Sequence, residues 1–244
     1  MSPSSLSDYK AHYQLDAEAI IELDDLHPTR RVSERRRFEA LLRLLQVRPD
    51  QRLLDIGCGS GWFSALCQEQ GARVWALDMA PAGVARARAR FPAVPYFQAG
   101  DVYHLPFADA SFDAVVLSEV VEHLEHIEQA LAQVRRVLKP GGRVLVSVPY
   151  RETILEHLCI HCNQLTPSHA HLHSFDESAL REHLQEQGLA PAGHVLVTNK
   201  LLELAGFPRW SLRWPHWAWR GVDRLFNRLV RRPAFIGIVG VRTP

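Results

Sequence analysis

The sequence predicts an α/β protein in which helices cover both faces of a parallel sheet. Three observations predict this class. Apolar runs of strand length alternate with segments of helical periodicity along the middle of the chain. The first of these runs leads into a glycine-rich turn, as expected where a ligand approaches the main chain. The length of 244 residues, 47% of them hydrophobic, suits one such domain with additional segments.

The first half of the predicted sheet alternates strictly between strand and helix. A strand at 52–56 (RLLDI) precedes a helix at 62–69, and a strand at 73–77 precedes a helix at 81–90. A short strand around 94–98 completes this half. Sheets of this kind bind ligands at the carboxyl ends of their strands, near the point where the strand order reverses, so we expect the site there.

The second half begins with the most apolar strand. Residues 112–118 (FDAVVLS) form a continuous apolar run, which is typical of a strand buried on both faces. Residues 127–138 carry apolar side chains at helical spacing, and the Pro-Gly-Gly sequence at 140–142 is expected to end that helix. The remaining predicted elements are a strand at 143–148, a helix between the N-cap Asp176 and Gly188, and strands around 194–198 and 235–241.

The two ends of the chain differ in composition from this core. Residues 1–28 contain six acidic residues and one lysine, whereas residues 205–233 contain seven arginines and one aspartate. Four of the six tryptophans fall within positions 210–219. We therefore expect one domain with an N-terminal helical cap at 1–50, a core at 51–198 and 234–244, and a basic, Trp-rich insertion at 199–233.

Charge and cysteine content exclude several classes of protein. The formal net charge is +1, so no strong overall field attracts nucleic acid; we expect no DNA partner and disfavour RNA. No apolar run approaches the roughly 18 residues of a membrane span. Four cysteines are too few for a disulfide framework, and the first residues lack the pattern of a signal peptide. A cytoplasmic protein with reduced thiols is expected.

The glycine-rich turn is the strongest motif. Residues 57–61 read Gly-Cys-Gly-Ser-Gly, directly after the first strand and before the first helix of the core. A pyrophosphate-binding turn would place its third glycine at position 62, which is a tryptophan here. Taken alone, the turn is also compatible with an ordinary strand-to-helix loop.

Two aspartates follow at intervals that suit a nucleoside ligand. Asp78 ends the second strand about 20 residues after the glycines, where an acidic side chain accepts hydrogen bonds from ribose hydroxyls. Asp101 follows the third strand in Gly100-Asp101-Val102, where a carboxylate is placed to accept from an adenine amino group. Each of these acids, taken singly, is also compatible with a solvated loop residue.

Taken together, residues 53–150 resemble the class I S-adenosylmethionine-dependent methyltransferases, because four motifs occur in order and at the expected spacing. They are the glycine-rich turn, Asp78, the Gly-Asp-Val sequence at 100–102, and the strand at 112–118 with the later Leu-Lys-Pro-Gly-Gly sequence at 138–142. The resemblance implies a Rossmann-like, seven-stranded, mostly parallel sheet with an antiparallel last strand. It also implies S-adenosylmethionine as cofactor, with its methionine part near Asp55 and the glycines and its nucleoside near the aspartates. The implied cofactor-binding residues are Asp55, Gly57, Cys58, Gly59, Asp78, Met79, Asp101, Val102 and Ser118.

An E-x-x-E-H sequence directly follows the fourth strand. If a helix begins at Glu119, then Glu119, Glu122 and His123 share one face, and two carboxylates so close favour a cation or a proton between them. The sequence is similar to that of two metal-dependent O-methyltransferase families, which act on quinone rings in ubiquinone biosynthesis and on the terminal 2′-hydroxyl of small RNAs. In the second family a distant histidine completes the site; His173 is the first candidate here and His171 the second.

These residues predict Mg²⁺ held by Glu119, Glu122, His123 and His173, with His123 and Glu122 as the catalytic residues. Without a metal, His123 is the candidate general base. The alternative interpretation is a polar helix start that faces solvent, with His123 at the surface.

A competing metal site lies further along the chain. Cys159 and Cys162 form a C-x-x-C sequence, and histidines follow at 169, 171 and 173. Such residues bind Zn²⁺ tetrahedrally, although a histidine-rich loop with free thiols explains them as well. His173 cannot serve both sites.

Residues 214–232 predict an amphipathic helix whose apolar arc is flanked by arginines. Three interpretations are open: a helix that lies on an anionic membrane, a lid over an apolar substrate, and a helix docked on the sheet by its apolar arc. The first makes 209–232 a peripheral contact with the inner membrane face. The predicted apolar arc comprises Trp214, Trp217, Ala218, Val222, Leu225, Phe226 and Leu229.

The function favoured by the sequence is S-adenosylmethionine-dependent methyl transfer to a hydroxyl of a small apolar, quinone-like or lipid-like acceptor. One alternative is metal-independent N- or C-methylation of a natural product or glycan. The other is a cofactor-binding protein that does not catalyse a reaction.

Overall fold

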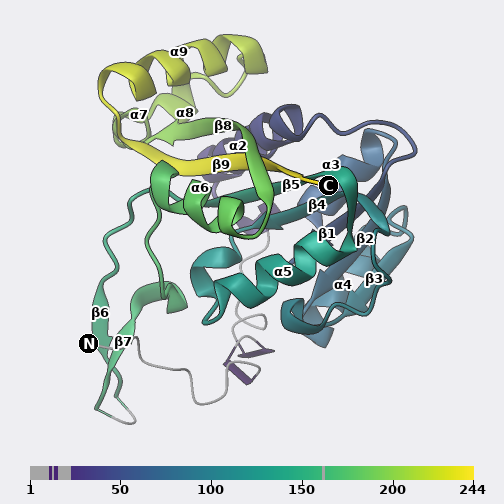
Figure 1. The fold of residues 1–244 in the computed structure, drawn as a ribbon. Coiled ribbons are helices and arrows are strands. Elements are labelled where there is room, and N and C mark those ends of the chain that lie inside the picture. The colour runs from purple at the N-terminus through teal and green to yellow at the C-terminus, as the bar shows by residue number, and fades with distance from the viewer. Residues whose placement is uncertain (1–10, 13, 16–22, 161–162) are drawn as a thin grey trace.

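The computed structural model describes residues 11–12, 14–15, 23–160 and 163–244 (Figure 1). Most of the acidic segment at 1–28 and Cys162 of the predicted zinc site lie outside the described residues. The described residues form a seven-stranded sheet in the order β3-β2-β1-β4-β5-β9-β8. The strands are β1 (Arg52–Ile56), β2 (Arg73–Asp78), β3 (Tyr96–Ala99), β4 (Phe112–Ser118), β5 (Leu138–Pro149), β8 (Leu189–Asn199) and β9 (Pro233–Arg242).

The strands pair in parallel from β3 to β5, and β9 is antiparallel to both β5 and β8. This arrangement confirms the predicted sheet with its antiparallel last strand. The predicted bounds of β1 and β4 agree with the structure, whereas β5 begins earlier than predicted. The residues at 140–142 belong to β5 itself, because Leu138 already pairs with Phe112 of β4, across an irregularity in register.

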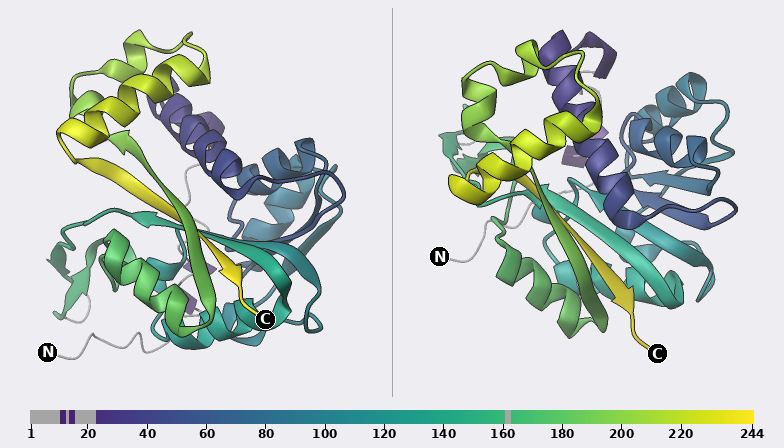
Figure 2. Two further views of the ribbon diagram at one scale, coloured as in Figure 1. Left: turned by 45° about the horizontal axis from the view of Figure 1, so that its top comes forward. Right: turned by 90° about the horizontal axis from the view of Figure 1, so that it is seen from above.

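Helices cover both faces of the sheet (Figure 2). One face packs against α2 (Pro28–Leu45), α3 (Trp62–Glu69) and α4 (Pro81–Arg90). The other packs against α5 (Ile127–Val137) and α6 (Glu177–Glu186). The sheet is therefore buried on both sides, which explains the continuous apolar run of β4.

Short elements complete the described fold. As predicted, Asp176 caps α6, and its side chain accepts from the backbone N–H groups of Ser178 and Ala179. Among the described residues, no helix is both long enough and apolar enough to cross a membrane. The short elements are η1 (Leu23–Asp25), η2 (Val102–His104), η3 (Val121–His123), β6 (Glu156–Leu158), β7 (Leu165–Pro167), η4 (Ser168–Ala170), α7 (Lys200–Leu204) and α8 (Phe207–Trp210).

The basic insertion ends in α9 (His216–Leu229), which packs beside β8 with an unexpected face. Its buried residues are Trp219, Asp223 and Asn227. The Asp223 carboxylate accepts from the backbone N–H of Asn199 at 2.8 Å, and the Asn227 side-chain oxygen accepts from the Asn199 amide at 2.8 Å. The helix therefore docks on the sheet, as one interpretation predicted, but through the arc of Trp219, Asp223 and Asn227 and not through the predicted apolar arc.

Substitution of Asp223 tests this attachment. Asp223→Ala removes a buried carboxylate that pairs with Arg220 at 2.7 Å and caps the backbone of Asn199, so we expect unfolding to become easier by about 3 kcal/mol. Thermal denaturation followed by circular dichroism measures the change. Arg224→Ala, an exposed change on the same helix, is the control and should alter stability by less than about 0.5 kcal/mol. Equal effects of the two substitutions would contradict this account.

Candidate functional site

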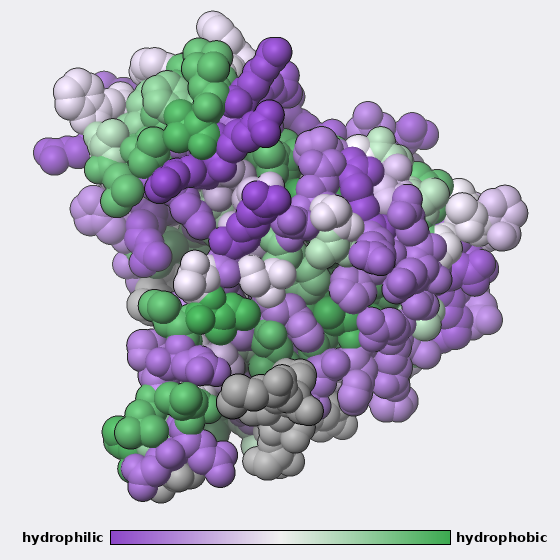
Figure 3. Space-filling view, turned by 60° about the vertical axis from the view of Figure 1, so that its left-hand side comes forward, coloured by the Kyte–Doolittle hydropathy of each residue, from purple (hydrophilic) through white to green (hydrophobic). Residues whose placement is uncertain are grey.

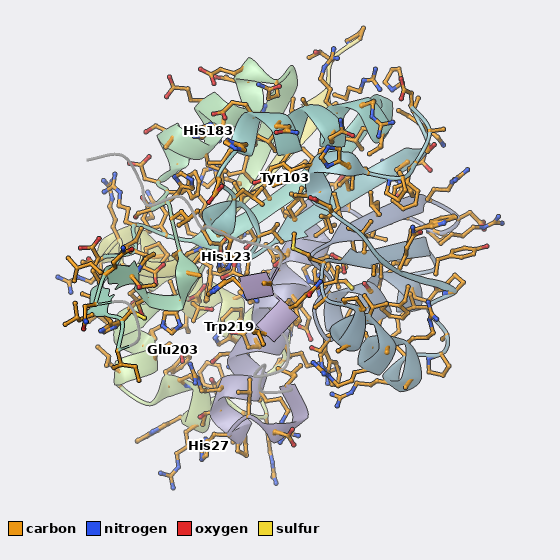
Figure 4. All side chains as sticks on the ribbon, turned by 90° about the horizontal axis from the view of Figure 1, so that it is seen from below. His27, Tyr103, His123, His183, Glu203 and Trp219 are labelled. Atoms are coloured by element: carbon orange, nitrogen blue, oxygen red, sulfur yellow. The ribbon has the colours of Figure 1, made fainter. Side chains whose placement is uncertain are left out.

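A cavity of about 440 Å³ opens at the carboxyl ends of β1, β2 and β4. The sheet order reverses between β1 and β4, so the cavity lies where the topology predicts a ligand site. Figure 4 looks onto this end of the sheet, with His123 near the middle. The predicted cofactor residues that line the cavity are Asp55, Gly57, Cys58, Gly59, Asp78, Met79, Val102 and Ser118.

The glycine-rich turn forms one wall. The backbone N–H of Gly57 donates to the Leu77 carbonyl at 2.8 Å, which joins the turn to β2. Gly57 has a φ of +70°, and a Cβ atom there would lie 2.4 Å from a methyl of Val120. Gly59 has a φ of +49°, and no protein atom lies within 4 Å of the place where its Cβ would stand. A side chain is thus excluded at Gly57 and would occupy open space at Gly59, where a ligand can approach the main chain.

Asp78 is held in a fixed orientation at the end of β2. Its two carboxylate oxygens accept from the backbone N–H groups of Gly59 at 2.8 Å and Ala80 at 3.0 Å. Each oxygen retains acceptor capacity for a further hydrogen bond, because a carboxylate accepts about four in all. The residue therefore suits a ligand that presents two neighbouring hydroxyls.

Asp55 lies deeper in the same wall. Its side chain is buried and accepts from the Ser64 hydroxyl at 2.5 Å. Burial, assisted by the negative charge of Asp78, raises the pKa of Asp55 to about 7. A cationic group beside Asp55 would offset the cost of its ionisation.

Asp101 is placed differently from the prediction. It does not line the cavity, although its neighbours Gly100 and Val102 do. Its carboxylate accepts from the backbone N–H of Tyr103 at 2.9 Å and so caps η2. This hydrogen bond of Asp101 therefore stabilises the start of η2.

The helix expected at Glu119 is absent. Glu119 has a φ of +59°, which reverses the chain, and only the three-residue helix η3 follows. As a result, the Glu119 side chain points to α2 and pairs with Arg37 at 3.0 Å. Desolvation raises the pKa of Glu119 to about 7, against the opposing charge of Arg37. Arg37 also pairs with Glu34 at 2.8 Å, so the guanidinium is shared between two carboxylates.

Glu122 is the most unusual residue of the site. Its side chain is only 1% exposed, and neither carboxylate oxygen has a hydrogen-bond partner among the described residues. Burial, followed by repulsion from Glu119, raises the pKa of Glu122 well above its usual range. A buried carboxylate in this state favours a proton or a cation beside it.

His123 and His171 stand next to Glu122. Ligand atoms of Glu122, His123 and His171 all lie within 4.8 Å of one another. The Nδ1 atom of His123 lies 3.2 Å from the carbonyl oxygen of Ala170, and His171 pairs with Glu152. Burial, followed by the nearby His171, lowers the pKa of His123 to about 4, so its imidazole is neutral at physiological pH.

His173, the first candidate for this cluster, lies elsewhere. The Glu122 carbonyl accepts from the backbone N–H groups of both Leu172 and His173, and this fixes the segment against η3. In that position the His173 ring contacts the Leu124 carbonyl at 2.8 Å, and His171 takes the place beside His123. Within the described part of the chain, the residues able to ligate a metal together include neither Glu119 nor a cysteine.

The N-terminal segment supplies part of the cavity that the motifs did not predict. Leu23, Leu26, Glu34, Arg37 and Phe38 all line it. They come from η1 and α2 and carry no motif of their own. Little in the sequence marks this wall, because α2 is only weakly amphipathic and buries two arginines, Arg36 and Arg37.

Comparison with known proteins agrees with this geometry. Residues 54–146 match the methyltransferase domain family. A malonyl-(acyl-carrier protein) O-methyltransferase of Serratia marcescens is 41% identical over 109 residues, which are 45% of this chain and 42% of that protein. A demethylmenaquinone methyltransferase of Beutenbergia cavernae is 39% identical over 108 residues, covering 44% of this chain and 45% of that protein. The chain thus matches less than half the length of these curated relatives.

Solved structures extend the likeness of fold to nearly the whole chain. The 1,6-didemethyltoxoflavin-N1-methyltransferase of Burkholderia thailandensis, solved with S-adenosylhomocysteine, covers 97% of this chain and 88% of its own, with 21% identity and a TM-score of 0.62. A methyltransferase of Mesorhizobium loti covers 91% of this chain and all of its own, with 20% identity and a TM-score of 0.63. Residues 54–146 therefore match the methyltransferase domain family, and the described fold is that of solved S-adenosylmethionine-dependent methyltransferases.

Proposed function

We propose that the protein transfers the methyl group of S-adenosylmethionine to a hydroxyl of a small apolar, quinone-like or lipid-like acceptor. The observation that carries the proposal is the position of His123: a neutral imidazole lines the same cavity as the glycine-rich turn and Asp78, with a buried carboxylate behind it. The names of two relatives lend partial support: the malonyl-(acyl-carrier protein) O-methyltransferase supports transfer to oxygen, and the demethylmenaquinone methyltransferase supports a quinone-like or lipid-like acceptor.

The turn and the aspartates bind the cofactor in this proposal. Gly57 and Gly59 admit its methionine part, Asp55 pairs with its amino group and Asp78 accepts from its ribose hydroxyls. Met79 and Val102 contact the adenine, and Cys58 and Ser118 complete the wall. When bound, S-adenosylmethionine supplies a positively charged methyl sulfonium with a good leaving group, so the protein's main task is to hold the acceptor in line with it.

His123 faces the acceptor. If its Nδ1–H donates to the Ala170 carbonyl, Nε2 is the basic nitrogen, and without a bound metal it accepts the acceptor's hydroxyl proton as the oxygen–methyl bond forms. The apolar side chains of Leu23, Leu26 and Phe38 line the same cavity and suit a ring or an alkyl chain. Arg37 pairs with both Glu119 and Glu34, so carboxylates of the protein offset its charge in the cavity wall.

A divalent cation fits beside this site. Glu122, His123 and His171 are the residues that would hold it, and the Glu122 carboxylate lacks any other partner among the described residues. Two imidazoles and one carboxylate suit a transition-metal ion better than Mg²⁺. Such an ion would lower the pKa of a bound hydroxyl. Zn²⁺ at Cys159 and Cys162 stays a prediction from sequence.

The raised pKa of Asp55 predicts that cofactor binding depends on pH. Its pKa of about 7 in the ligand-free protein means that it is protonated below pH 7 and then lacks the charge that pairs with the ligand's amino group. Affinity for S-adenosylhomocysteine should therefore fall as the pH drops through 7. Isothermal titration measures it, and Asp55→Asn should bind weakly with a flatter profile. A profile that is the same in both proteins would remove the assigned role of Asp55.

An acceptor screen tests the reaction itself. The purified protein is incubated with S-adenosylmethionine and catechols, quinols or long-chain alcohols, and products are analysed by mass spectrometry. We expect the addition of one methyl group to oxygen. Methylation of nitrogen or carbon would favour the metal-independent alternative, and cofactor binding without turnover of any acceptor would favour the non-catalytic one.

Two further assays in the same screen test whether activity requires a divalent cation. Activity should be lost in EDTA and restored by Mn²⁺ or Co²⁺, and Glu122→Gln should lower it by at least about 100-fold, because a metal ligand is removed. Glu128→Gln, at an exposed position of α5, is the matched control and should leave activity unchanged. Full activity in EDTA would refute the metal site while leaving His123 as the base.

A further inference from the structure

We propose that α7, α8 and α9 form a surface that binds an anionic membrane, and that the cleft between α2, β8 and α9 holds the phosphate of a lipid headgroup. This inference goes beyond the proposed function, since it does not depend on the methyl acceptor. The segment is also separate from the cofactor cavity, because no residue of 199–233 lines that cavity. This separation also disfavours the lid interpretation.

The first observation is the orientation of α9. Asn199 donates hydrogen bonds to Asp223 and Asn227, which hold the polar arc of α9 against β8, and the opposite apolar arc faces outward. Trp217 is 78% exposed and Leu229 is 71% exposed. A helix that docks by its hydrogen-bonding side leaves its apolar side available for a different partner.

The exposed apolar residues extend over neighbouring elements. Figure 3 shows hydrophobic side chains gathered over α9 at the top of this face, next to strongly hydrophilic ones. The same face carries a second apolar area at the β6–β7 hairpin, where Leu158 and Ile160 are exposed. We call the upper area the α9 patch; it consists of Leu204, Trp210, Trp214, Trp217, Leu225 and Leu229.

The second observation is a cationic cleft beside the α9 patch. A cleft of about 450 Å³ is lined by Arg43, Arg220, Arg224, His194 and His216, and also by Trp217 of the patch. Guanidinium groups bind phosphate oxygens in paired hydrogen bonds, so this lining suits a phosphate group.

Acidic side chains offset only part of this charge. Arg220 pairs with the buried Asp223, His216 with Glu39 and His194 with Glu177. Arg43 and Arg224 remain exposed on the two helices that flank the cleft. The cleft therefore stays cationic, and Trp217 joins it to the apolar patch.

The α9 patch and the cationic cleft together indicate an anionic membrane as the partner. Exposed tryptophan and leucine side chains beside arginines are typical of helices that lie in the headgroup region of an anionic bilayer. The apolar side chains of the α9 patch insert into the bilayer, and the arginines of the cleft pair with a lipid phosphate. Nucleic acid fits less well, because aliphatic leucines neither stack on bases nor pair with phosphates.

Vesicle binding tests the proposal. The full chain is sedimented with vesicles of phosphatidylcholine alone and of phosphatidylcholine mixed with phosphatidylglycerol. We expect binding to the mixed vesicles only, and weaker binding as salt is raised. The double variant Arg43→Gln/Arg224→Gln should bind roughly 30-fold more weakly, since each arginine contributes about 1 kcal/mol at an anionic surface. Trp217→Ser/Leu229→Ser should lose at least about tenfold.

Matched controls separate the proposal from misfolding and from the proposed function. Arg48→Gln/Arg86→Gln removes two exposed arginines outside the cleft and should bind the mixed vesicles like the unaltered protein. All variants should keep their thermal stability and their affinity for S-adenosylhomocysteine. Absence of vesicle binding, equal binding to uncharged vesicles, or unchanged binding by both cleft and patch variants would overturn the proposal. Binding of inorganic phosphate without vesicle binding would also overturn it and indicate a site for soluble anions.

Discussion

The hydrogen bond from the Gly59 N–H to the Asp78 carboxylate is the contact on which the cofactor cavity depends. It ties the turn after β1 to the end of β2, while the N–H of Gly57 ties the same turn to the Leu77 carbonyl. The turn can lie this close only because position 57 has no side chain to collide with Val120. The Asp78 carboxylate and the backbone geometry of the turn together keep the space beside the main chain open.

Next to this turn, the site contains more carboxylate side chains than cationic side chains. Glu119 and Glu34 share the charge of Arg37, whereas Glu122 has no described cation beside it. Desolvation raises the pKa values of both Glu119 and Glu122, so the ligand-free site favours a proton or a cation there. The same constraint links the acceptor chemistry to His123, which adjoins Glu122 and stays neutral.

Local signals predicted the fold well and the contacts between distant segments poorly. The strands and helices around the glycine turn followed from apolar runs and turn residues, which act over a few positions. The docking of α9 did not, because a helical wheel defines two arcs, and contacts with the distant strand β8 select the arc of Trp219, Asp223 and Asn227. Likewise, the H-x-H spacing could not choose His171 over His173, and no motif marks Arg37, whose partner Glu119 lies far along the chain.

A crystal structure of the protein with S-adenosylhomocysteine tests the central claim most directly. The account predicts the ligand in the cavity at the ends of β1, β2 and β4, with its ribose hydroxyls on Asp78 and its amino group beside Asp55. A ligand bound at any other place, or a cavity closed by its own side chains with the ligand excluded, would contradict it.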